Sequence, residues 1–207
     1  MSNTQKNIFL LLIKPKLILH LMEQIIKDTT ANPAPLGLFG FGMTTILLNI
    51  HNAGFFELNA MIMGMGIFFG GIQQVIAGVM EWKKGNMFAM AAFTSYGFFW
   101  LSLVALWLLP MMGVTKSDGT SMGFYLGMWG VFTLAFFIGT LKGNTIGKLI
   151  FGSLVVLFAL LSVASFTGSE AIHTFAGYEG ILCGSFAFYE AAALIINEKL
   201  GKEVLPL

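Results

Sequence analysis

The stretch Asn32-Pro-Ala-Pro-Leu-Gly-Leu38 opens an apolar run that continues as Phe39-Gly-Phe-Gly-Met-Thr-Thr-Ile-Leu-Leu-Asn49. Its two prolines suit the first turn of a helix, because the N–H groups that they lack would have no partner there. Asn32 stands just ahead of them, where an asparagine side chain can cap free backbone donors. A helix N-terminus of this kind also attracts anions. The plainer interpretation is that the stretch only begins a first membrane helix.

The composition is that of a membrane protein. Of the 207 residues, 57% are hydrophobic and 10% are charged, and the mean hydropathy is +0.82. Soluble domains carry about 25% charged residues, so we expect an all-α polytopic membrane protein. The net charge of +1 argues against a nucleic-acid partner. The sequence contains no zinc-ligand spacing, phosphate-binding loop or hydrolase motif, so we expect no metal, no cofactor and no enzymatic activity.

Six apolar runs are each long enough to cross a bilayer as a helix, which takes about 20 residues. They are approximately Leu36–Ala53, Ala60–Met80, Met87–Leu109, Ser121–Leu141, Gly147–Phe166 and Thr174–Ile196. Before them, polar and apolar residues from Pro15 to Asp28 follow helical spacing. This pattern predicts an amphipathic helix on the membrane surface, or one docked on its own protein. We expect an interfacial segment at 1–31, a transmembrane domain at 32–200 and a short tail at 201–207.

The lysines predict the orientation. All eleven basic residues are lysines, and with both termini on one side only Lys116 lies on the other side. Because basic residues remain in the cytoplasm, we expect both termini of a multi-pass protein of the plasma or inner membrane to be cytoplasmic.

The spans also form a repeat of three hairpins. The first helix of each hairpin follows an asparagine, namely Asn32, Asn86 and Asn144. The first two asparagines are 54 positions apart and the last two are 58 apart. Three equivalent hairpins predict a quasi-threefold bundle in which one helix of each pair faces a central path.

Phe41, Tyr96 and Leu154 lie nine or ten residues after these asparagines, so they should project at a similar depth. Three bulky groups at one depth would close an apolar constriction of the kind that gates by dewetting. Plain helix packing is the alternative. Hydroxyl side chains nearby in the sequence favour a lumen over a lipid face, and they are Thr44, Thr45, Thr94, Ser95 and Ser153.

Two carboxylates fall within the last run. Glu190 lies inside it and Glu179 lies near its outer end. An intramembrane carboxylate is a candidate for proton coupling or a cation site. The alternative is that Glu190 extends toward the cytoplasmic head groups, near Lys199 or Asn197.

The chain resembles the acetate uptake transporter family, whose signature matches Asn32–Leu38. The likeness continues in ordered blocks to the C-terminus, and these include His51-Asn-Ala-Gly54, Ala92-Phe-Thr-Ser-Tyr-Gly97, Leu126-Gly-Met-Trp-Gly-Val-Phe-Thr133, Gly139-Thr-Leu-Lys-Gly143, Phe175-Ala-Gly177 and Val204-Leu-Pro206. The resemblance implies a six-helix protomer that assembles as a homo-hexamer within membrane lipid. It also implies transport of acetate, and in some members of succinate or other short carboxylates.

The resemblance implies a set of site residues as well. The narrow point of the family is formed by a Phe, a Tyr and a Leu, which correspond to Phe41, Tyr96 and Leu154. Family-matched positions in or beside the path are Asn32, Thr44, Thr45, Gln74, Thr133 and Ala187. Gln73, Glu179 and Glu190 depart from the family pattern, so no family role is carried over to them.

We therefore expect membrane transport of acetate through an apolar constriction, coupled to protons. An uncoupled channel for small carboxylate anions is the first alternative. A membrane scaffold or sensor that transports nothing is the second.

Overall fold

The computed structural model describes residues 15 and 30–207. The chain divides into two compact units, Met1–Asn32 and Pro33–Leu207, and the helices described below belong to the second unit. The amphipathic helix predicted from Pro15 to Asp28 lies outside the described residues, except for Pro15 itself.

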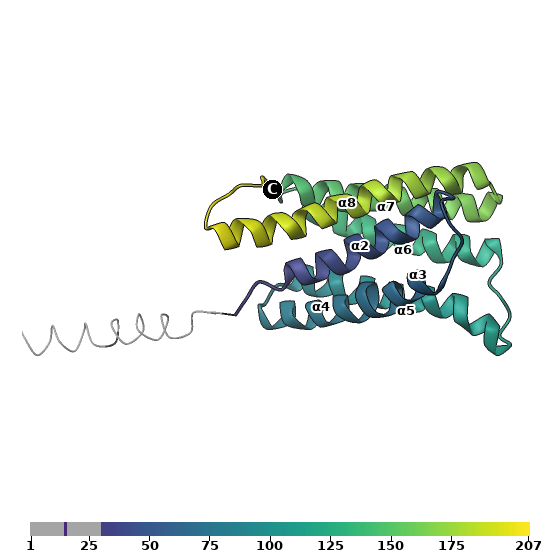
Figure 1. The fold of residues 1–207 in the computed structure, drawn as a ribbon, viewed down its shortest axis with the longest axis horizontal. Coiled ribbons are helices and arrows are strands. Elements are labelled where there is room, and N and C mark those ends of the chain that lie inside the picture. Colours follow the sequence, from purple (N-terminus) through teal and green to yellow (C-terminus); the bar gives the residue numbers. More distant parts are fainter. Residues whose placement is uncertain (1–14, 16–29) are drawn as a thin grey trace, which may run out of the picture. The chain divides into compact units, whose positions relative to one another are not determined.

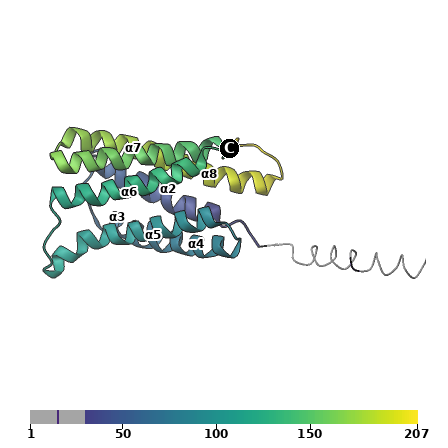
Figure 2. The ribbon, with the colours of Figure 1, turned by 180° about the vertical axis from the view of Figure 1, so that it is seen from behind.

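Six helical stretches of the second unit are long and apolar enough to cross a membrane. They are α2 (Ala34–Asn52), then α3 (Ala60–Gly64) with the π-helix η1 (Met65–Gln73) and α4 (Gln74–Lys83), then α5 (Met87–Leu108) with the 3-10 helix η2 (Leu109–Met112), then α6 (Gly119–Thr140), α7 (Thr145–Thr167) and α8 (Glu170–Leu200). They run alongside one another in a bundle (Figures 1 and 2). The six predicted spans are confirmed, with ends that differ by a few residues.

Polar caps explain why several helices extend beyond the apolar runs. Asp118 accepts a hydrogen bond from Ser121 N at 2.7 Å at the start of α6. The Ser169 hydroxyl caps α8 in the same way, so this helix begins four residues before the apolar run does. At α2 the N-cap position is occupied by Pro33, the residue after Asn32.

The glycines of the opening stretch determine how closely other helices approach α2. A Cβ atom on Gly37 would lie 2.5 Å from the Phe93 ring of α5, and one on Gly40 would lie 2.6 Å from a backbone oxygen of η1. A Cβ atom on Gly42 would lie 2.8 Å from a backbone nitrogen of α8. Three successive glycines therefore admit three different neighbours, which makes α2 central to the bundle.

The most closely packed helices belong to different hairpins of the repeat. α2 packs most extensively on α8, α6 packs on α7, and α5 packs on α4 and η1. α5 and α6, which form one hairpin in the sequence, meet mainly through aromatic rings, such as Phe99 and Trp129 with centroids 5.0 Å apart. Large rings thus separate α5 from α6, whereas glycines let the other pairs approach closely.

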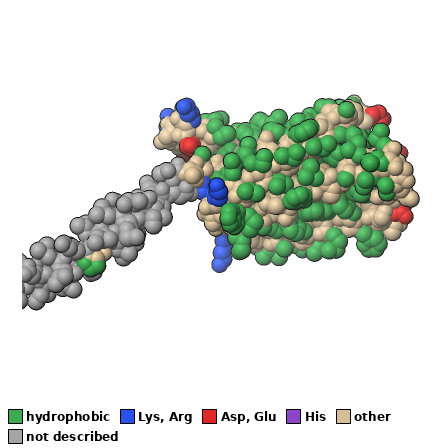
Figure 3. Space-filling view, turned by 90° about the horizontal axis from the view of Figure 1, so that it is seen from below, with side chains coloured by type: hydrophobic (Ala, Val, Ile, Leu, Met, Phe, Trp, Pro, Cys, Tyr) green, Lys and Arg blue, Asp and Glu red, His purple; other side chains and the backbone are tan. Residues whose placement is uncertain are grey.

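The outer surface of the bundle suits a lipid environment. Phe68, Phe124 and Met128 are 68%, 66% and 67% exposed. Apolar side chains cover the visible face, and lysines gather at one end (Figure 3). Among the described lysines, Lys116 alone lies in a connection at the opposite end of the helices.

The segment after α8 folds back onto that helix. The Tyr189 hydroxyl donates to Pro206 O at 2.9 Å, and Asn197 Nδ2 donates to Leu205 O at 2.7 Å. Asn197 Oδ1 also accepts from Val204 N at 2.7 Å. The Asn197 side chain therefore holds the tail.

Candidate functional site

Two cavities lie inside the bundle. The first, named here the Asn144 cavity, has a volume of about 340 Å³ and is lined near its mouth by Asn144 and Glu190. The second, the Asn49 cavity, has a volume of about 220 Å³ and is lined by Asn49, His51 and His173 toward the opposite end. Most lining residues of both come from α2, α5 and α7, the first helices of the three hairpins, as the repeat predicted.

Three side chains line both cavities, and they are Phe41, Tyr96 and Leu154. We call them the neck. They come from α2, α5 and α7 and are 8%, 3% and 2% exposed. The ring centroids of Phe41 and Tyr96 are 6.0 Å apart. The neck is therefore a buried, largely apolar junction between two hollows, and its three residues are those that the repeat and the family resemblance selected.

The Tyr96 ring is held by a hydrogen-bonded pair. Its hydroxyl lies 2.9 Å from Thr133 Oγ1, which itself lies 2.7 Å from Trp129 O. A carbonyl oxygen only accepts, so Thr133 donates its single proton to Trp129 O. Tyr96 must then donate to Thr133, and the proton of the phenol is directed away from the path.

Replacing Tyr96 by phenylalanine is expected to lower the free energy of unfolding by about 0.5–1.5 kcal/mol, because one buried hydrogen bond is lost. Thr133 keeps its bond to Trp129 O, and the ring that forms the neck remains. Thermal unfolding in detergent measures the change. Tyr178, which is 53% exposed, provides the control Tyr178→Phe, and an equal loss there would contradict this explanation.

Gln74 lines the Asn144 cavity and is fully buried. Its Nε2 donates to Gly70 O at 2.6 Å within the π-helix, so the amide orientation is set by a carbonyl that can only accept. Gln74 Oε1 has no hydrogen-bond partner in the described part of the chain. The adjacent Gln73 has a structural contact instead, since its Nε2 donates to Leu36 O at 2.9 Å.

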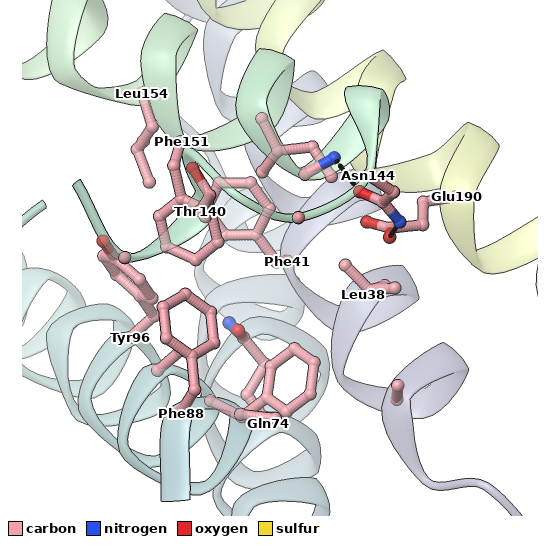
Figure 4. Close-up of a pocket in the computed structure, with 18 residues that line it drawn as sticks. Leu38, Phe41, Gln74, Phe88, Tyr96, Thr140, Asn144, Phe151, Leu154 and Glu190 are labelled. Atoms are coloured by element: carbon pink, nitrogen blue, oxygen red, sulfur yellow. Dashed lines mark hydrogen bonds between the residues drawn. The ribbon is translucent and has the colours of Figure 1, made fainter. Parts of the chain in front are cut away.

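Glu190 is bonded to the N-cap residue of α7. Its Oε1 accepts from Asn144 Nδ2 at 2.9 Å, and both residues line the Asn144 cavity (Figure 4). The sequence placed Glu190 near Lys199 or Asn197 of its own segment, and the observed hydrogen-bond partner is the residue that caps α7. Asn144 is exposed and Glu190 is half-buried, so the pair lies at the mouth of the cavity.

The Asn49 cavity carries a different set of polar groups. Asn49 Nδ2 donates to Thr45 O at 2.9 Å, and Asn52 Nδ2 donates to Asn49 Oδ1 at 3.1 Å. His51 Nδ1 lies 2.7 Å from Phe56 O, so this nitrogen carries the proton. Thr45 also lines this cavity, and its Oγ1 is buried without a partner among the described residues.

Several residues expected from the sequence lie away from both cavities. Thr44 and Ala187 are fully buried but line neither, and Thr133 contacts the neck only through Tyr96. Glu179 also lines neither cavity. Asn32 belongs to the other compact unit. Of the five hydroxyl residues that lie near the neck in the sequence, Thr45 lines a cavity and the other four line neither.

Sequence reasoning missed Asn144, Asn49 and the two histidines as lining residues. The antiparallel order of the spans contained a usable signal for His51 and His173, because the end of the first span and the start of the sixth must lie on one side. The same order places the start of the fifth span and the end of the sixth on one side, but it does not predict that Asn144 and Glu190, which are 46 positions apart, form a hydrogen bond. Within the described residues, no cluster of three or more His, Cys, Asp or Glu side chains could hold a metal ion.

Six spans around two cavities that meet at a neck define a multi-pass membrane protein with the architecture of a transporter or channel. The chain belongs to the GPR1/FUN34/yaaH family, whose model matches residues 16–203.

Relatives of this chain have names that refer to transport or to a channel. The chain is 56% identical over 178 residues to the succinate-acetate/proton symporter SatP of Escherichia coli (strain K12), covering 86% of this chain and 95% of the relative. It is 38% identical over 178 residues to ammonia transport outward protein 2 of Saccharomyces cerevisiae, covering 82% of this chain and 63% of that protein. A solved structure of the bacterial acetate channel SatP matches with a TM-score of 0.85 and 54% identity, covering 86% of this chain and 99% of that chain.

Proposed function

We propose that this chain transports acetate, and other short carboxylates such as succinate, across a cell membrane through the neck. The observation that carries the proposal is that Phe41, Tyr96 and Leu154 are the side chains shared by the linings of both cavities. Two relatives bear names that refer to acetate, one as a succinate-acetate/proton symporter and one as an acetate channel.

The chemistry of the path supports a small substrate with one apolar end. A methyl group fits an apolar neck, whereas a hydrated inorganic ion would have to leave its water behind. Polar groups then serve the carboxyl end on each side, with Gln74 and Asn144 in one cavity and Thr45 and Asn49 in the other. None of the described lysines lines either cavity, so binding should be weak and exchange should be fast.

We propose that transport is coupled to protons, with an uncoupled carboxylate channel as the alternative. The experiment is acetate flux in proteoliposomes with pH and voltage varied independently. Uptake that follows the pH gradient at constant acetate and ignores the voltage supports coupling, and uptake that follows the voltage and the acetate gradient alone supports the channel. Absence of any carboxylate flux in a folded preparation would overturn transport and favour a scaffold or sensor.

We further propose that the protein works as a homo-hexamer in the plasma or inner membrane, with both termini in the cytoplasm. The lysine distribution supports this orientation. Large exposed side chains on α6, such as Phe124, Met128 and Val131, suit a subunit or lipid contact. Mass measurement in detergent tests the assembly, and labelling of single cysteines introduced at Lys116 and Lys202 tests the orientation.

A further inference from the structure

The mouth of the Asn144 cavity contains an acidic side chain with no cation beside it in the lining. Among the described residues that line this cavity, Glu190 is the one that carries a full charge when ionised, and there is no lysine or histidine. The neck lies at the far end of the same hollow. A carboxylate anion that enters here meets a like charge before it reaches the neck.

A hydrogen bond from Asn144 fixes the position of the Glu190 carboxylate. Asn144 Oδ1 accepts from Gly147 N at 2.7 Å as the cap of α7, so its Nδ2 is the atom left for Glu190 Oε1. The two side chains meet across α7 and α8 (Figure 4). The carboxylate therefore cannot turn away from the mouth without losing this hydrogen bond.

The remaining polar groups of the cavity are largely bonded within the protein, and one buried acceptor is unpaired among the described residues. The Thr140 hydroxyl donates to Phe137 O at 2.7 Å, and Tyr96 donates to Thr133. One N–H of Gln74 is bonded to Gly70 O, while its Oε1 is unpaired. An acetate anion brings only acceptors, but acetic acid brings an O–H donor. The neutral acid can therefore donate to Gln74 Oε1, which the anion cannot do.

Charges on the neighbouring elements do not compensate Glu190 within this lining. The nearby lysines and carboxylates are Lys148 on α7, Lys142 in the turn before it, Glu198 and Lys199 on α8, and Lys202 and Glu203 in the tail. None of them lines the cavity, and α2 and α4 contribute only uncharged residues to it.

We propose that Glu190 is a charge filter at this mouth of the path. When ionised, it turns away carboxylate anions and leaves the neutral acid as the form that enters; when protonated, it admits the anion as well. The inference rests on the proposed function. It identifies the protonated monocarboxylic acid as the substrate form on this side, so that each acid molecule carries its own proton through the neck.

The test is the acetate-dependent current of Glu190→Gln in proteoliposomes at equal pH on both sides. Glutamine keeps the shape of the side chain and an acceptor for Asn144, so only the charge is lost. Measurements at about pH 7.5 keep acetate anionic, because a carboxylic acid with a pKa near ~4.3 is ionised there. We expect Glu190→Gln to raise the current at this pH about tenfold, the size of one charge repulsion at a partly solvated site.

Two further variants distinguish an effect of the lost charge from an effect on the protein structure. Glu190→Asp keeps the charge and should keep the low current of the wild type. Glu198→Gln removes an exposed charge from the same end of α8, outside the cavity lining, and should behave as the wild type. Size-exclusion profiles in detergent establish whether each variant is folded. If Glu190→Gln is misfolded, Glu190→Ser serves as a second uncharged variant.

Equal currents in the wild type and in folded Glu190→Gln would overturn the charge filter, as would complete loss of flux in that variant. A large methylammonium current in the wild type that Glu190→Gln abolishes would also overturn it, because the carboxylate would then serve a cation. If the wild type carries no carboxylate at all, the proposed function fails instead, so the two failures are distinguishable.

Discussion

Replacing Leu154 by alanine is expected to admit acids that the wild type excludes, with lactate and succinate uptake rising relative to acetate by about tenfold or more. Leu154 is 2% exposed and lines both cavities, so removing its isobutyl group joins the two hollows. A single methylene in an apolar pocket changes discrimination by about 1–3 kcal/mol, and this substitution removes three carbons. Competition between labelled acetate and each larger acid in proteoliposomes measures the change.

Leu157→Ala is the matched control for this experiment. Leu157 lies one turn further along α7, is 4% exposed, and lines the Asn49 cavity but not the other one. It should lose stability as any buried leucine does and keep the size limit of the wild type. An unchanged limit in Leu154→Ala, or the same widening in both variants, would show that the neck does not select by size.

Replacing Gly42 by valine is expected to prevent assembly of the bundle. A Cβ atom at Gly42 would lie 2.8 Å from Phe188 N and 2.9 Å from Gly184 O, which are backbone atoms of α8. No side-chain rotation relieves such contacts, so α2 and α8 must separate. Overpacking a core typically costs about 1–3 kcal/mol, and the loss of the most extensive helix pair should exceed this. Fluorescence-detected size exclusion after heating measures the folded fraction.

Gly64→Ala provides the control at a glycine that touches nothing. Gly64 has helical angles (φ −61°, ψ −46°), and no heavy atom lies within 4 Å of the added Cβ. Alanine is favoured over glycine inside a helix by about 0.5–1 kcal/mol, so this variant should be as stable as the wild type or slightly more so. Equal damage from Gly64→Ala and Gly42→Val would mean that close helix approach is not the reason.

The three neck residues could be selected from the periodicity of the sequence alone. Counting nine or ten residues from three asparagines selects Phe41, Tyr96 and Leu154, and the structure places all three where two cavities meet. The counting works because a helix advances by a constant rise per residue. It does not depend on Asn32 being the cap, since one residue of difference at the start of α2 changes the depth only slightly.

The same reasoning fails for polar residues around the neck. Thr44, Thr45, Thr94, Ser95 and Ser153 are all close to it in sequence, but only Thr45 faces a cavity. Ser153 donates to Leu149 O, one turn back in its own helix, at 2.6 Å. Depth along a helix follows from residue number, whereas the direction of a side chain around the axis depends on how the helix is rotated against its neighbours.

The sequence by itself determined the membrane class, the six spans, the end that carries most lysines and the three neck residues. Hydropathy, charge and spacing along one helix are local properties, so they can be read without coordinates. Only the tertiary structure decided that α2 packs on α8, that aromatic rings separate α5 from α6, and that Asn144 holds Glu190 at a mouth of the path. These contacts depend on which glycines and which large rings meet across helices that are far apart in the chain, and that information is distributed over the whole sequence.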